Sequence, residues 1–151
     1  MRSSQLALVA SAWVVGLALS AAAVAPTPNA PENRAEDEKH GAVLCSWAIS
    51  LDIQYVADRC YPGQDPEFRA ALSSSISRME TFIERNGGWT PEDIQRHHSS
   101  PEREFEGRDV CKVADVVEMY QAAEAAGPAA TKKGTDELLA VPREPEMDPC
   151  L

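Results

Sequence analysis

Four cysteines, Cys45, Cys60, Cys111 and Cys150, are the residues of this chain whose number and spacing most restrict their chemistry. An even cysteine count favours a disulfide framework in a protein that reaches an oxidising compartment. Structural zinc sites need closely spaced ligands, and the sequence has neither a C-x-x-C nor an H-x-x-x-H motif. We therefore predict two disulfides and no metal site.

The adjacent histidines His97 and His98 are a second group that could do chemistry, as metal ligands or as proton carriers. Neighbouring residues on a helix point about 100° apart, so the two imidazoles are poorly placed to chelate one ion. The alternative, which we favour, is structural: two exposed histidines at a fraying helix end, where positive charge interacts well with the helix dipole.

Asp52 falls inside the apolar face of a helix predicted over residues 41–61, where an ionised carboxylate needs a partner or a raised pKa. We favour a structural pair with an arginine such as Arg59 or Arg78 over a functional acid. Trp47 lies at the margin of the same face, where it either packs in the core or edges a groove for a partner peptide or lipid. With the two histidines, Asp52 and Trp47 complete the candidate functional residues.

Helical spacing of apolar residues, interrupted by proline, glycine and capping residues, predicts the elements that must position these side chains. Three prolines after Val141 prevent a regular helix and favour an extended segment. The predicted fold is all-α, a small up-and-down bundle of four to five helices stapled by two disulfides, with an extended proline-rich C-terminal strap. The helices are predicted over residues 41–61, 66–86, 91–98 with a restart at 100–101, 109–126 and 129–140. An alternative start for the last helix is Thr135, because Gly134 weakens its middle.

The order of the helices selects one of the three possible cysteine pairings. In a continuous first helix, Cys45 and Cys60 lie about 22 Å apart, far beyond the roughly 7 Å between Cα atoms that a disulfide tolerates. Short connections favour antiparallel neighbours, which bring Cys111 to the end that holds Cys60 and return the fourth helix toward Cys45. We predict the pairs Cys60–Cys111 and Cys45–Cys150.

The N-terminus has the three parts of a secretory signal: Arg2, an apolar run over residues 6–19 and small residues up to Ala25. We predict a signal peptide over residues 1–23, cleaved between 20 and 25, because the strongly apolar part is shorter than the roughly 20 residues of a membrane anchor. Residues 24–39 are predicted to be a flexible leader, and residues 40–151 a disulfide-linked helical domain. The expected location is periplasmic or secreted, with no stable membrane insertion.

The formal net charge of −10 argues against nucleic acid as a partner, because an acidic protein repels phosphate backbones. No catalytic or cofactor motif is present, and the serine run 73–75 lacks a nucleophile elbow. We therefore predict no catalytic residues, no cofactor and no enzymatic activity.

The function we favour is that of a small exported helical protein that binds another protein or a small ligand. The first alternative is a holding chaperone for acid or envelope stress, which would uncover apolar surface as its carboxylates become protonated. The second is a hydrolytic or metal-dependent enzyme that uses Asp52, His97 or His98.

Overall fold

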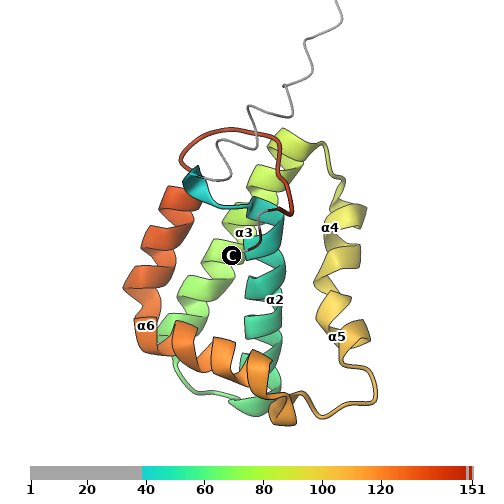
Figure 1. Ribbon diagram of the computed structural model, residues 1–151, viewed down its shortest axis with the longest axis vertical. Helices are drawn as coiled ribbons and strands as arrows, with labels where there is room; N and C mark the ends of the chain where they lie inside the picture. Colours follow the sequence, from blue (N-terminus) through green and yellow to red (C-terminus); the bar gives the residue numbers. More distant parts are fainter. Residues whose placement is uncertain (1–38, 149, 151) are drawn as a thin grey trace, which may run out of the picture.

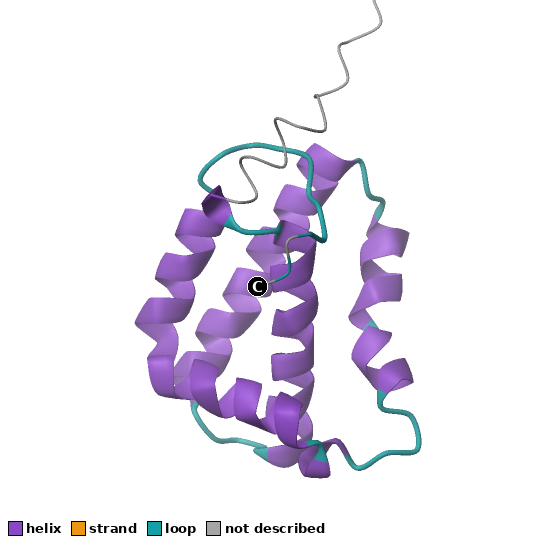
Figure 2. Cartoon of the chain, in the orientation of Figure 1, coloured by secondary structure: helices purple, strands orange, loops and turns teal. Residues whose placement is uncertain are grey.

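The computed structural model describes residues 39–148 and residue 150. This part of the chain is helical and contains no strand, so the all-α prediction is confirmed (Figures 1 and 2). None of its helices is long and apolar enough to cross a membrane. The predicted signal peptide, residues 1–23, and residues 24–38 of the predicted leader lie outside the described residues. The elements are α2 (Val43–Cys60), α3 (Pro66–Gly87), α4 (Pro91–His98), α5 (Ser100–Glu104), the 3-10 helix η1 (Val110–Lys112) and α6 (Ala114–Leu138).

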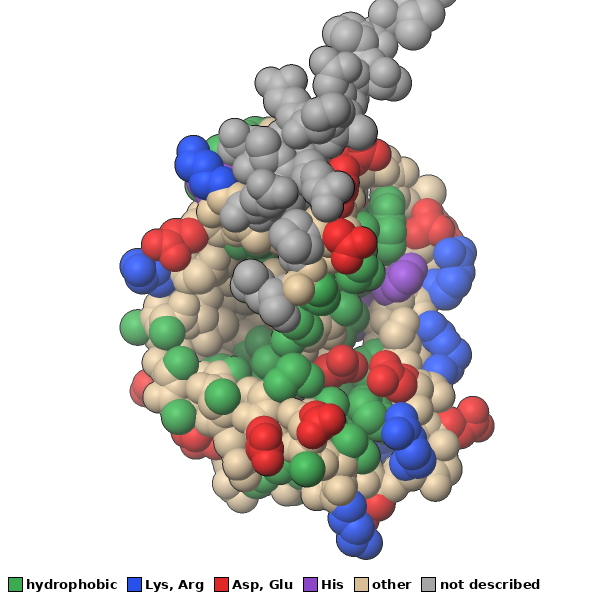
Figure 3. All heavy atoms as spheres, in the orientation of Figure 1, with side chains coloured by type: hydrophobic (Ala, Val, Ile, Leu, Met, Phe, Trp, Pro, Cys, Tyr) green, Lys and Arg blue, Asp and Glu red, His purple; other side chains and the backbone are tan. Residues whose placement is uncertain are grey.

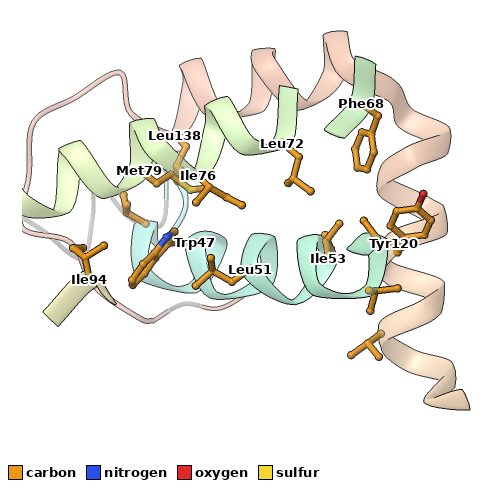
Figure 4. Close-up of a cluster of buried hydrophobic side chains, with 14 of the residues drawn as sticks. Trp47, Leu51, Ile53, Phe68, Leu72, Ile76, Met79, Ile94, Tyr120 and Leu138 are labelled. Carbon is orange, nitrogen blue, oxygen red and sulfur yellow. The ribbon is translucent and has the colours of Figure 1, made fainter. Parts of the chain in front are cut away.

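Helices α2 and α3 build the centre of the core. Pro66 occupies the first turn of α3, where a missing N–H costs nothing, and Gly88 ends the helix with a φ of 66°. One apolar stripe of this helix, whose members follow one another at spacings of 4, 4, 3 and 4 residues, is buried throughout, at 4% exposure or less. Figure 4 shows this stripe facing the apolar side chains of α2. Its members are Phe68, Leu72, Ile76, Met79 and Ile83.

Helix α6 takes a different path from the predicted one. The expected helix over residues 109–126 was to run back along the bundle, but the chain forms η1 and then crosses the ends of α2 and α3 (Figures 1 and 4). It turns at Gly127, whose φ of 83° is non-helical, and only the second half of α6 runs beside α3. Pro128 disfavours helical geometry in the residue before it, and glycine accepts the positive φ that results. Residues 128–138 therefore make the return that we had assigned to the preceding helix.

Both predicted disulfides are confirmed. Cys60 pairs with Cys111 and Cys45 pairs with Cys150, with Cα atoms 5.5 Å apart in each pair. Cys60 is the last residue of α2 and Cys111 lies in η1, so this bond fixes the end of the core that α6 crosses. Paired cysteines are compatible with an exported protein.

Residues 139–148 contain neither helix nor strand and pass over the N-terminal end of α2 (Figure 1). The backbone N–H of Leu44 donates to the carbonyl of Glu146 at 3.0 Å. Arg143 is only 5% exposed; it donates to the carbonyl of Gly41, and its guanidinium carbon lies 5.7 Å from the centre of the Phe82 ring. These contacts attach the C-terminal segment to α2 and α3.

Candidate functional site

A cavity of about 80 Å³ lies between α2 and the α4–α5 pair, and we call it the α2–α4 groove. Apolar side chains make most of its wall, and two carboxylates and one histidine interrupt them. Figure 3 shows acidic side chains beside hydrophobic ones in the strip between these helices. Three of the four candidate residues, Trp47, Asp52 and His97, line the groove.

Helix α4 is held in place by its own first turn and one buried anchor. The Thr90 hydroxyl accepts from the Asp93 N–H at 3.2 Å, and the Thr90 N–H donates to the Asp93 carboxylate at 3.0 Å, which completes a capping box. The Thr90 N–H, the Thr90 hydroxyl and Arg96 all donate to the Asp93 carboxylate, and these bonds lower the pKa of Asp93 to about 2. Ile94, only 7% exposed, belongs to the core, so α4 and the groove wall that it carries have a defined position.

Trp47 joins the groove to the core. Its side chain is 2% exposed, and its indole N–H donates to Oε1 of Glu80 at 3.2 Å. Its ring centre lies 5.9 Å from that of Trp89 and 5.8 Å from that of His97, and the Trp89 and His97 rings are 4.8 Å apart. The prediction that Trp47 packs in the core is confirmed, and the same side chain also lines the groove.

The two histidines are partly buried, not exposed as expected, and they have different surroundings. His97 packs against Trp47 and Trp89 in the groove, whereas Nε2 of His98 contacts the Glu80 carboxylate, the same group that accepts from Trp47. The 100° between neighbouring helical positions accounts for this separation. In residues 39–148 and 150, no group of three or more His, Cys, Asp and Glu side chains could hold a metal ion.

The arginine partners expected for Asp52 are engaged elsewhere. Arg59 pairs with Glu102 at 3.6 Å, and Arg78 pairs with Asp136 at 2.7 Å. The prediction of a structural pair is wrong for both arginines, because their long side chains reach exposed carboxylates on neighbouring helices. Among the described residues, none forms an ion pair with Asp52.

Asp52 instead shares the groove with a second carboxylate, Glu104 of α5. Burial, and to a lesser extent the negative charge of Glu104, raises the pKa of Asp52 to about 6. Sequence reasoning missed Glu104 because it did not show which side of the short α5 helix faces α2. The predicted restart at Ser100–Pro101 was the available signal for that helix.

The groove therefore combines aromatic rings, a small apolar cavity and two carboxylates near one another. The carboxylates of such a site can accept hydrogen bonds from a cation, and Asp52, with a pKa of about 6, can exchange a proton in mildly acidic solution. No protein-family model, curated protein or solved structure matches this chain.

Proposed function

We propose that this protein is a small, exported, non-catalytic binding module, and that its α2–α4 groove holds a lysine or arginine side chain of a basic protein partner. The observation that carries the proposal is Asp52: a partly buried carboxyl group, next to Glu104, that forms no ion pair with any described residue. Desolvation and like charge both disfavour its ionised form, and a bound cation would reverse that penalty.

The chemistry of the wall suits a cation on an apolar stem. Two unit charges 4 Å apart attract by about 4 kcal/mol at the effective dielectric near a protein surface. Tryptophan faces attract cations as well, and Trp89, which lines the groove, is only partly buried. Lysine and arginine lay their methylene groups along apolar surface while the charged head reaches polar groups. Leu51 supplies such apolar surface one helical position before Asp52.

The size of the groove favours one side chain over a free small molecule. Its volume of about 80 Å³ is well below the 300 Å³ or more that is usual for cofactor and ligand pockets. The net charge of −10 would also speed the approach of a basic partner and disfavour an acidic one.

We also propose the finer architecture that accompanies this function: an up-and-down bundle in which the C-terminal segment serves as a strap. This segment contributes Met147, which lines the groove and is 48% exposed, and Cys150 joins its end to α2. An exposed methionine beside a groove offers adaptable apolar contact to an incoming side chain. The N-terminal signal pattern and the disulfides support a periplasmic or secreted location.

The test is a titration of the disulfide-bonded protein with a short lysine-rich peptide and with the same peptide carrying norleucine in place of lysine, followed by tryptophan fluorescence. We expect the lysine peptide to bind at least tenfold more tightly. The variants Asp52→Asn and Glu104→Gln should each weaken its binding about tenfold, because each removes one of the two charges.

The matched control is Glu118→Gln, which removes one exposed carboxylate from α6, outside the residues that line the groove. It should change the affinity less than twofold. Equal binding of the two peptides would show that the lysine charge contributes nothing to affinity. Equal losses in the Asp52 and Glu118 variants would show that attraction depends only on total charge. Either result would overturn the proposal.

A further inference from the structure

A second and larger cavity, of about 320 Å³, lies between α2, α3 and the second half of α6, and we call it the α2–α3–α6 cavity. Phe68, Leu72 and Met79 of α3 form its floor and are 4% exposed or less. Figure 4 shows Phe68 and Leu72 directed into the space between α2 and α3, and Figure 3 shows a hollow with hydrophobic side chains at its base. The base of this cavity is therefore part of the core.

Four of the five hydroxyl side chains that line the cavity are already engaged within the protein, and Ser46 is the exception among the described residues. Ser50, Thr131 and Thr135 donate to carbonyl groups one helical turn earlier, at 2.7, 3.1 and 2.9 Å. The Thr135 and Ser75 oxygens also lie 2.8 Å apart, and both residues are buried. No aspartate, glutamate, lysine or arginine lines the cavity in the described part of the chain, and His40 is its one titratable lining residue there. The cavity therefore offers an occupant apolar contact and few free hydrogen-bonding groups.

The path of α6 explains why side chains leave this space open. The turn at Gly127 places the second half of α6 beside α3, and that half faces the cavity with small residues, among them Ala130 and Gly134. A Cβ atom added at Gly134 would meet no atom within 4 Å. The cavity therefore exists because α6 turns at Gly127 and because the residues that it presents there are small. A larger side chain at position 134 would enter unoccupied space.

We propose that the α2–α3–α6 cavity binds a neutral, unbranched aliphatic chain of about 10–12 carbon atoms. An apolar cavity of about 150 Å³ accommodates benzene, with six carbons, so a cavity about twice that size accommodates roughly twelve. Because the lining carries no arginine or lysine and the protein has a net charge of −10, the occupant is an uncharged molecule such as a fatty alcohol and not a fatty acid anion. The buried floor supplies the apolar contact that drives its binding.

The probe for this site is 1-decanol, added to the disulfide-bonded protein and followed by calorimetry and by the melting temperature. We expect saturable binding and a rise in melting temperature, because a ligand that binds only the folded state stabilises it. Sodium decanoate should bind at least fivefold more weakly. Affinity should increase from hexanol to decanol and stop increasing beyond dodecanol.

Two variants at one position test the location of the site. Gly134→Leu should weaken decanol binding at least tenfold by occupying the cavity. Gly134→Ala, which makes a similar change in helix propensity with a single methyl group, should retain it within twofold. Equal decanol binding by the wild type and a folded Gly134→Leu protein, or no binding to the wild type, would overturn the proposal.

Methyl NMR of the wild-type protein locates the alcohol without any variant. The proposal requires shifts at Leu72, Met79 and Leu138, which line the cavity, in preference to Leu44 and Leu51, which line the α2–α4 groove. Shifts confined to the last two residues would place the alcohol in the groove and overturn it. Asp52→Asn should bind decanol as the wild type does, so this inference and the proposed function fail separately.

Discussion

The α2–α4 groove and the α2–α3–α6 cavity share one wall, helix α2, but differ in the chemistry of the other walls. The short helices α4 and α5 form the other wall of the groove and bring Glu104 toward Asp52. The long helices α3 and α6 form the other walls of the cavity, with hydroxyl and apolar side chains. The groove has a volume of about 80 Å³ and two carboxylates in its lining. The cavity has a volume of about 320 Å³ and no carboxylate among its described lining residues. One amphipathic helix can therefore serve two unlike sites, because the elements packed on each side decide what each site can bind.

Replacing Cys45 and Cys150 by serine should cause the largest loss of stability, and this loss should affect the groove more than the cavity. The C-terminal segment that their disulfide fixes contributes Met147 to the groove and no lining residue to the cavity. Opening a loop of 105 residues should lower the free energy of unfolding by about 4 kcal/mol. Urea unfolding would measure this loss.

In the same variant, peptide binding should weaken more than decanol binding. Hydrogen exchange at the Leu44 amide should also accelerate, since its acceptor, the Glu146 carbonyl, belongs to the released segment. Unchanged protection at Leu44 would show that the segment stays docked without the disulfide.

Trp47→Phe should damage the groove selectively. The change removes the hydrogen bond to Glu80 and part of a buried aromatic contact, so the free energy of unfolding should fall by about 2–3 kcal/mol. Peptide affinity should fall with it, while decanol affinity stays within twofold. Trp89→Phe, at a partly exposed position in the same aromatic cluster, is the matched control and should cost about 1 kcal/mol or less.

Asp52→Asn should stabilise the protein at neutral pH while it weakens peptide binding. The folded-state pKa of about 6 lies above the ordinary value of 3.8, so the folded state keeps a proton that the unfolded state loses between these values. The wild type therefore loses stability from this group as pH rises from about 4 to 6. With allowance for solvent screening, the variant should gain about 1 kcal/mol at pH 7 and almost nothing at pH 4.

Thermal unfolding at the two pH values measures this difference, with Glu118→Gln as the control for net charge. A gain of the same size at pH 4 and pH 7 would mean that Asp52 is not the group that titrates.

The smallest expected change in the free energy of unfolding comes from a substitution in the wall of the cavity. Gly134→Ala should raise the free energy of unfolding by about 0.5–1 kcal/mol, because alanine restricts the unfolded chain and Gly134 already has a helical conformation with space for a methyl group. Groove binding should not change. A loss of stability in denaturant titrations would show that the space beside residue 134 is closed.

Signals confined to a few neighbouring residues predicted the fold well. Pro66 and the Thr90–Pro91 pair mark helix starts through backbone geometry alone, and the length of α2 was enough to separate Cys45 from Cys60. The Gly127–Pro128 pair predicted a break, but the direction of the chain after it depends on what α6 packs against. Local sequence carries no information of that kind.

The sites were less predictable for the same reason. Asp52 was identified by its position on an apolar face, yet its neighbour proved to be Glu104 and not an arginine, since that depends on how α5 is rotated against α2. The α2–α3–α6 cavity had no sequence signal, because small residues such as Ala130 and Gly134 read only as ordinary helix positions until α6 is placed in space.

The two disulfides also make the stability of the folded state depend on the redox conditions around the chain. Each contributes about 2–5 kcal/mol, and a small domain has a net stability of only about 5–15 kcal/mol. With both bonds reduced, as in a reducing cytoplasm, we expect the folded state to lose most of its advantage over the unfolded chain. In the exported protein proposed here, the reduced chain would therefore be largely unfolded while it crosses a membrane, and oxidation on the far side would shift the equilibrium to the folded state.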